Sequence, residues 1–269
     1  MKVFFLGGGN MGAAMVGGLV AQGFAASDIT VAEPSAPARE RLVRTHGVSA
    51  IAPPSAWPPA DVAVLAVKPQ QMRDAVRALG KPPAALLLVT IAAGIRIADL
   101  ARWLGGHAAI VRAMPNTPAL VRCGITGLYA PAAVDHAARE RASRLLGAVG
   151  ETVWLDREED LDAVTAVSGS GPAYVFYLME ALEAAGRDMG LAPEAARKLA
   201  LQTFVGAATL AQSRAEDPAI LRAQVTSPGG TTERALTEME RAGLKAAFIE
   251  AVKAARSRSA ELGDAYGKD

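Results

Sequence analysis

Short apolar segments alternate with longer segments rich in alanine and charged residues over the first 155 residues of the chain. Several of the short segments are apolar nearly throughout, which is typical of strands that are buried on both faces of a parallel sheet. Because such strands alternate with helices, the pattern predicts an α/β domain. The expected strands are residues 2–6, 29–32, 62–67, 85–91, 109–113, 127–130 and 152–155.

The pattern changes at Glu158, after which alanine, leucine, glutamate and arginine recur at helical spacing. We therefore predict two domains: a parallel-sheet domain over residues 1–157 and an all-α domain over residues 158–269. The expected interruptions of the helical half are residues 168–172, Gly190, residues 217–218 and residues 227–230.

The first helix of the second half is expected to begin at Pro172, because proline suits the first helical position. Residues 173–179 are apolar on nearly every side of that helix, so it must be buried on more than one side. A domain of about 110 residues has a limited interior. We therefore expect a second copy of the chain to cover part of the helix, giving a homodimer. A helix at the centre of a monomeric bundle is the alternative.

The charge balance is close to neutral, with 28 lysines and arginines against 27 aspartates and glutamates. It gives no reason to expect nucleic acid or a membrane surface as a partner, so a small molecule is the expected ligand. The longest apolar run, residues 84–93, is far shorter than the roughly 20 residues that span a bilayer.

The chain has a single cysteine, Cys123, which rules out an internal disulfide and fits a reducing cytosol. The first residues show no export signal, and a cytoplasmic location is expected. No spacing of metal ligands is present, so no metal is expected. His46, His107 and His136 stand in polar segments and are expected at the surface.

A glycine cluster follows the first expected strand and precedes an amphipathic segment. Residues 7–12, Gly-Gly-Gly-Asn-Met-Gly, contain the spacing G-x-G-x-x-G. Gly7 permits a tight turn, Gly9 lets the backbone approach a pyrophosphate, and Gly12 allows the helix to pack against the strand. The helix N-terminus offers N–H groups to the phosphates. The setting predicts a dinucleotide site, and a glycine turn needed only for packing is the alternative.

The end of the second strand bears on the choice between NADH and NADPH. Glu33 lies 21 residues beyond Gly12, about where an acidic residue holds the ribose hydroxyls of NAD. A carboxylate there repels a 2′-phosphate, which favours NADH. Ser35 and Arg39 could still bind a phosphate, and a solvated Glu33 is a further alternative.

Three further loops follow expected strands, where ligands of parallel sheets bind. Lys68, in residues 66–69, could contact ribose or nicotinamide, or could simply start a helix. Residues 92–94 follow the next strand, and Asn116, among the prolines of residues 114–118, could orient a ligand or bridge a turn.

Two glycine-rich turns interrupt the helical half, at residues 168–174 and 225–233. The second, Ser-Pro-Gly-Gly-Thr-Thr over residues 227–232, presents backbone N–H groups and hydroxyls to a small anion such as a carboxylate. The alternative is that both turns are helix caps and nothing more.

Six of these segments, taken in order, resemble the pyrroline-5-carboxylate reductases across nearly the full length of the chain. They are residues 7–12, 66–69, 92–94, 114–118, 168–174 and 227–232. The resemblance implies a Rossmann domain followed by a helical dimerisation domain, with dimers that often associate into decamers. It implies reduction of 1-pyrroline-5-carboxylate to L-proline with NADPH or NADH as the cofactor. It also implies that Ser227, Gly230 and Thr231 hold the substrate carboxylate, and that Thr232 bonds the ring nitrogen as the catalytic residue. The candidate cofactor residues are Leu6, Gly7, Gly8, Gly9, Asn10, Met11, Gly12, Glu33, Ser35, Ala66, Val67, Lys68, Pro69, Ala92, Ala93, Gly94 and Asn116.

One feature departs from the family. Many members carry Ser, Thr or Asn-Arg at the end of the second strand, where this chain has Glu33. Two other functions stay open: a 2-hydroxyacid or other imine reductase with the same cofactor half, and a non-catalytic dimer that senses dinucleotides. The complete turn at residues 227–232 argues against the sensor, which has no evident use for a carboxylate site.

Overall fold

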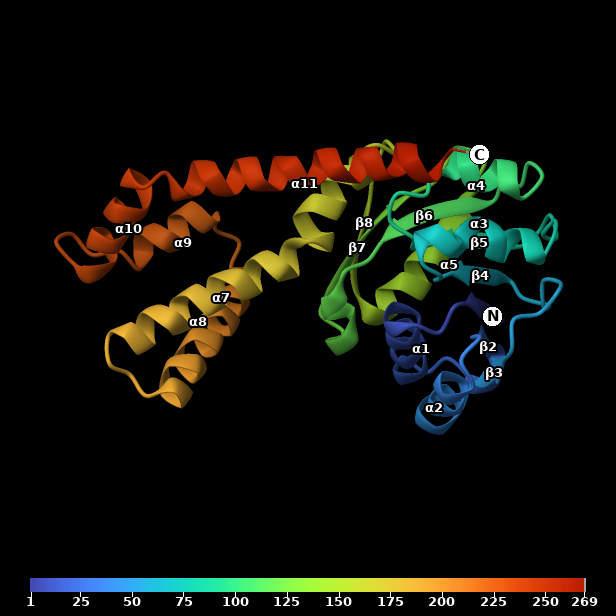
Figure 1. Cartoon of the computed structure of the whole chain (residues 1–269), viewed down its shortest axis with the longest axis horizontal. Helices are drawn as coiled ribbons and strands as arrows, with labels where there is room; N and C mark the ends of the chain where they lie inside the picture. The colour runs from blue at the N-terminus through green and yellow to red at the C-terminus, as the bar shows by residue number, and fades with distance from the viewer. Residues whose placement is uncertain (269) are drawn as a thin grey trace. The chain divides into compact units, whose positions relative to one another are not determined.

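The computed structural model describes residues 1–268, which form two compact units. The first unit, an α/β unit, comprises Met1–Ser170 together with the described residues from Ala255 onward. The second, Gly171–Ala254, is helical. Figure 1 labels most of the elements of both.

An eight-stranded sheet forms the centre of the α/β unit, in the order β3-β2-β1-β4-β5-β6-β7-β8. All neighbouring strands pair in parallel except β6 and β7, which are antiparallel. The strands are β1 (Val3–Leu6), β2 (Ile29–Ala32), β3 (Ser49–Ile51), β4 (Val62–Leu65), β5 (Leu87–Thr90), β6 (Ile110–Met114), β7 (Gly124–Tyr129) and β8 (Gly150–Trp154).

Helices cover both faces of this sheet, and two hydrophobic cores result. Val3 and Phe5 of β1 point into one core, whereas Phe4 and Leu6 point into the other. This alternation explains why β1 is apolar at every position, since each face of the strand is buried. The helices of the unit are α1 (Asn10–Ala21), α2 (Ala36–His46), α3 (Pro69–Ala78), α4 (Ile97–Trp103), α5 (His136–Leu146), α6 (Asp160–Val164) and the end of α11 (Leu244–Tyr266).

All seven expected strands are present, with ends shifted by a few residues. The sequence pattern missed β3, which has only three residues and no fully buried side chain. It also did not predict that β7 would run antiparallel to β6. The connection between them holds only the 3₁₀ segment η2 (Thr117–Val121), whereas a parallel return needs a crossover of about a dozen residues or more.

Four helices and the beginning of α11 form the helical unit. They are α7 (Gly171–Asp188), α8 (Pro193–Ser213), α9 (Pro218–Gln224) and α10 (Thr231–Arg241). α7 and α8 pack along each other, and a methyl carbon at Gly186 would lie 3.2 Å from the Cβ of Ala196. The rings of Tyr174 and Phe248 meet edge to face, with centroids 5.7 Å apart.

The expected interruption at residues 168–172 is smaller than the sequence suggested. After α6 the chain continues as a π-helical turn, Thr165–Gly169, and bends only at Ser170, so that α7 begins at Gly171. The hydroxyl of Ser168 donates to the carbonyl oxygen of Val164, four residues back, and that of Thr165 bonds in the same way to Leu161. Hydroxyls bonded in this way are compatible with continuing helix.

The expectation that His107 lies at the surface was wrong. Its side chain is 6% exposed, and its Nε2 lies 2.8 Å from the carbonyl oxygen of Leu86. Burial is the main reason that the pKa of His107 is lowered, because it disfavours the charged imidazolium. Within residues 1–268, no helix is both long enough and apolar enough to cross a membrane.

Candidate active site

The strand order reverses direction at β1, which has β2 on one side and β4 on the other. Crevices for nucleotides form at such points, outside the carboxyl ends of the strands. A cavity of about 410 Å³ lies there. Its lining comes mainly from the ends of β1 to β4 and from α3: Leu6, Gly7, Ala32, Pro34, Pro53, Pro54, Val67, Gln70, Gln71, Asp74, Ala75, Ala78 and Leu79.

The three glycines of the expected dinucleotide motif have different surroundings. Gly7 has φ of +109°, and a methyl carbon on it would lie 2.7 Å from the carbonyl oxygen of Ala66. At Gly12 it would lie 2.6 Å from the carbonyl oxygen of Gly7. At Gly9, by contrast, no atom lies within 4 Å. The protein itself requires glycine at positions 7 and 12, whereas the space at Gly9 is free for a ligand.

Gly8 also has a structural reason to be glycine, which the motif did not reveal. A methyl carbon there would lie 2.8 Å from Cδ1 of Leu42 and 3.1 Å from Cγ1 of Val31. Its backbone N–H donates to Oε2 of Glu33 over 3.0 Å. The run of three glycines was the only signal in the sequence, and it does not show which of them faces the protein.

Glu33 is held at the rim of the glycine loop by its backbone contacts. One carboxylate oxygen accepts from Gly8, and the other accepts from the N–H of Ser35 over 3.1 Å. The Ser35 hydroxyl caps α2 by accepting from the N–H of Ala38, and Nη1 of Arg39 donates to the carbonyl oxygens of Glu33 and Pro34. Both residues thus have local partners, although the Ser35 hydroxyl accepts in its bond and keeps its own hydrogen as a donor.

The loops at residues 66–69 and 92–94 are neighbours, because β4 and β5 pair in parallel and end at the same edge. Lys68 is exposed and stands directly before Pro69, the first residue of α3. Gly94 has φ of +77°. Asn116 is buried, and its Oδ1 accepts from the N–H of Ile125 over 2.9 Å, so it bridges its loop to β7.

The turn at residues 227–232 belongs to the helical unit and leads into α10. Gly229 has φ of +73°, and its N–H donates to Oε2 of Glu233 over 2.7 Å. Gly230 is the N-cap of α10 and provides no side-chain cap. The first N–H groups of a helix have no partner within it. Those of Thr231 and Thr232 therefore offer a site for an anion, beside two exposed hydroxyls.

Two protein families match parts of the chain. The dimerisation domain of pyrroline-5-carboxylate reductase matches residues 158–262, and the coenzyme F420-dependent NADP oxidoreductases match residues 2–94. The second match contains the glycine loop, Glu33 and the loops at residues 66–69 and 92–94. The first contains the turn that leads into α10.

Relatives match over the whole length. The pyrroline-5-carboxylate reductase of Pseudomonas aeruginosa is 48% identical, with 99% of this chain and 98% of the relative covered. A pyrroline-5-carboxylate reductase structure from Coxiella burnetii is 39% identical, with a TM-score of 0.90 and coverage of 97% and 98%. The pyrroline carboxylate reductase of Plasmodium falciparum, solved with NADP bound, is 28% identical, with a TM-score of 0.85 and coverage of 98% of each chain.

These matches extend over both units, and they agree with a Rossmann-type sheet followed by helices. The chain belongs to the pyrroline-5-carboxylate reductase family.

Proposed function

We propose that this protein reduces the C=N bond of 1-pyrroline-5-carboxylate, with NADH or NADPH as reductant, and releases L-proline. One observation carries the proposal. A chain that matches a pyrroline-5-carboxylate reductase from end to end keeps both the open space at Gly9 and the uncapped N-terminus of α10. These are the places where the two reactants would bind.

The turn before α10 would hold the carboxylate of the substrate. Ser227, Gly230 and Thr231 would supply the hydroxyls and N–H groups, and the positive end of the helix dipole would favour the negative charge. The bond from Gly229 to Glu233 keeps the turn closed. Thr232 would donate to or accept from the ring nitrogen and so orient the C=N bond.

The cofactor would lie along the carboxyl edge of the sheet, with its phosphates at Gly9 and at the N-terminus of α1. The size and position of the 410 Å³ cavity between the ends of β1 and β4 fit the adenosine half of a dinucleotide. When bound, the nicotinamide supplies a hydride to the carbon of the C=N bond. The proton on the nitrogen would come from water, with the Thr232 hydroxyl holding the nitrogen in place.

NADH is the proposed preferred cofactor. The Glu33 carboxylate uses two of its roughly four acceptor positions on backbone N–H groups, so ribose hydroxyls can still bond to it. The same negative charge would repel a 2′-phosphate.

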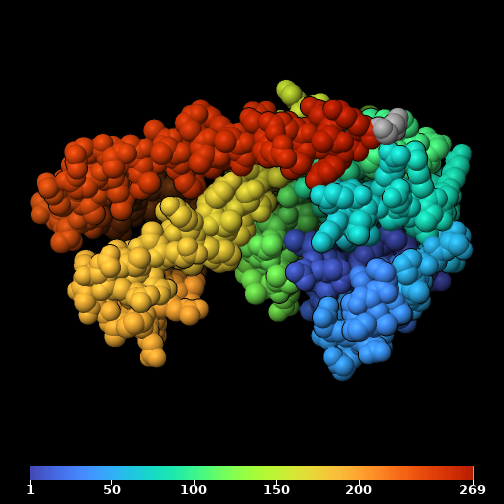
Figure 2. Space-filling model, in the orientation of Figure 1, coloured from blue at the N-terminus to red at the C-terminus, as the bar shows by residue number. Residues whose placement is uncertain are grey.

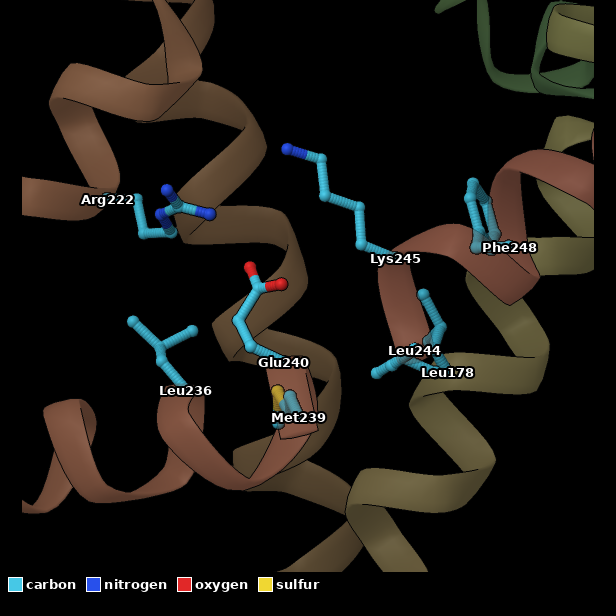
Figure 3. Close-up of a pocket in the computed structure, with 8 residues that line it drawn as sticks. All are labelled: Leu178, Arg222, Leu236, Met239, Glu240, Leu244, Lys245 and Phe248. Carbon is cyan, nitrogen blue, oxygen red and sulfur yellow. The ribbon is translucent and has the colours of Figure 1, made fainter. Parts of the chain in front are cut away.

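We further propose that the chain is a homodimer, with residues 158–269 as its substrate-binding and dimerisation domain. Phe176 and Tyr177 of α7 are 58% and 72% exposed in the single chain, which is costly for side chains of their size. A hollow of about 260 Å³ in the same unit is lined by five apolar side chains, among them Leu178 and Phe248, and by the charged Arg222, Glu240 and Lys245, as Figure 3 shows. Light scattering would show whether dimers associate further into decamers.

We also propose a cytoplasmic location, which fits the single cysteine.

Initial rates of NADH and NADPH oxidation at 340 nm with 1-pyrroline-5-carboxylate test the reaction, with chromatography to identify L-proline. Absence of proline, with a folded dimer that binds the cofactor, would refute the proposed activity. Thr232→Ala should lower turnover by about one to three orders of magnitude and leave cofactor affinity nearly unchanged, with Thr232→Ser as the matched control that keeps the hydroxyl.

A further inference from the structure

The last turns of α11 and the residue after it, residues 259–267, belong to the α/β unit and are attached to the rest of it at several points. Figure 2 shows the red atoms of this segment in direct contact with the cyan and green surface of that unit. Near the start of the segment, the buried Ser259 hydroxyl donates to Oδ1 of Asp162 over 2.7 Å. Near its end, Nη2 of Arg102 donates to the carbonyl oxygen of Gly267 over 2.7 Å.

Between these points the segment reaches the start of α3, directly after the loop at residues 66–69, and the loop at residues 92–94. Nε2 of Gln70 donates to the hydroxyl of Tyr266 over 2.8 Å. Arg96, the residue before α4, forms an ion pair of 2.6 Å with Asp264. The Tyr266 ring lies so close to Gly94 that a methyl carbon there would be 3.0 Å from the ring.

The approach at Gly94 depends on glycine on both sides. Gly94 has φ of +77°, and its carbonyl oxygen would lie 3.4 Å from a methyl carbon at Gly263 of α11. A larger side chain at either position would push the helix away from the loop. The loop backbone and the helix therefore pack directly on each other, with the Tyr266 ring as part of the contact.

These contacts lie at or beside the loops at residues 66–69 and 92–94, which the sequence predicts to line the cofactor. Gln70 itself lines the 410 Å³ cavity at the switch point of the sheet, and Gly94 ends the loop at residues 92–94. We propose that Tyr266 is a positioning residue for the cofactor site. Its hydroxyl holds Gln70, its ring supports Gly94, and the C-terminal segment thereby orders both loops for NADH or NADPH. This inference rests on the proposed cofactor site.

The contacts themselves suggest an effect on binding rather than on folding. Gln70 and Asp264 are exposed, and exposed polar pairs contribute little to the stability of a fold. They can still reduce the number of conformations of a loop, and a ligand that needs one conformation then binds more tightly.

The test compares the full-length protein with Tyr266→Phe, Gln70→Ala and the double variant. The Kd for NADH is measured by titration of its fluorescence, and KM and kcat by initial rates. Tyr266→Phe keeps the ring and removes the bond to Gln70, so the Kd should rise about two- to tenfold, as expected for one hydrogen bond. The Kd of the double variant should equal that of the single variant that binds NADH less tightly, because both changes remove the same bond.

Arg258→Ala is the matched control. Its side chain lies on the same helix and pairs with Glu261, three residues further along, over 2.7 Å, so the Kd should not change. In Tyr266→Phe the KM for the cofactor should rise while kcat at saturation and the KM for 1-pyrroline-5-carboxylate stay the same.

Three results would overturn the inference: an unchanged Kd in both single variants, single effects that multiply in the double variant, or a loss of kcat with an unchanged Kd. A parent protein that binds NADH but does not form proline would refute the proposed reaction alone. The Kd for NADH can be measured without turnover, so the two failures can be told apart.

Discussion

Replacing Gly9 and Gly12 by alanine, one at a time, should separate binding from packing within a single loop. A methyl carbon at Gly9 meets no atom within 4 Å, whereas one at Gly12 lies 2.6 Å from a backbone oxygen. The first change therefore alters only space that is proposed for the cofactor phosphates. The second forces the helix and the loop apart even without a ligand.

The magnitudes follow from these surroundings. At Gly9, the N-cap of α1, alanine caps the helix less well by about 0.5–1 kcal/mol. Alanine also reduces the conformational entropy of the unfolded chain, which stabilises the folded state by about 0.4–1 kcal/mol. The net change in stability should therefore be close to zero. If the methyl group costs the phosphate one charge-assisted hydrogen bond of about 1.5–3 kcal/mol, the Kd should rise about 10- to 100-fold.

At Gly12 the expected loss is in stability. Forcing a methyl group into a packed site costs about 1–3 kcal/mol, and the better helix propensity of alanine offsets part of it. A net loss of about 1–2 kcal/mol corresponds to a fall in Tm of about 2–8 °C for a unit of this size. Cofactor titration and thermal unfolding without ligand would be measured on both variants. Equal falls in Tm, or a Gly9→Ala variant that binds NADH as tightly as the parent, would refute the reasoning.

Three further outcomes are expected. Glu33→Ser should raise the ratio of kcat/KM for NADPH over NADH about 10- to 100-fold by removing the carboxylate, and an unchanged ratio would exclude Glu33 from cofactor choice. Glu158→Ala should cost about 2–4 kcal/mol in urea unfolding, because it leaves Arg112, whose side chain is 6% exposed, without its ion-pair partner; Glu158→Gln should cost less. The pKa of His107 is lower in the folded protein than in the unfolded chain, so the unfolded chain takes up the proton first as the pH falls. The fold should therefore have its full stability above about pH 6.5 and lose stability progressively below that value. In His107→Gln the Tm should therefore fall less between neutral and acidic pH than in the parent protein. An equal fall in both proteins would contradict this.

The parts of the fold that could be predicted from sequence are those with a local signal. β1 and β4 are apolar at each position because both faces are buried, and that signal is complete within each strand. β3 was not predicted, because three residues at a sheet edge carry no such signal. The direction of β7 depends on the length of the connection before it, which the hydrophobic pattern does not report.

The candidate site divides in the same way. The residue types and their order predicted the glycine loop and the turn before α10. The bond from Gly8 to Glu33 joins residues 25 positions apart, and that from Gln70 to Tyr266 joins residues 196 positions apart. Neither has a signal in spacing, since each depends on how the chain folds back. The C-terminal segment was therefore not expected near the cofactor loops.

Both proposed binding places share one arrangement of backbone. Each is the N-terminus of a helix whose N-cap is glycine, Gly9 for α1 and Gly230 for α10, and each follows a glycine with positive φ, Gly7 and Gly229. Serine or aspartate would cap these helices better, but its side chain would take the N–H groups that an anion needs. The chain does use such caps where no ligand is expected, as Asp135 does for α5 by accepting from the N–H of Ala138. Glycine at both N-caps therefore costs some helix stability and leaves the N–H groups open to ligands, as expected where two anionic reactants bind at helix N-termini.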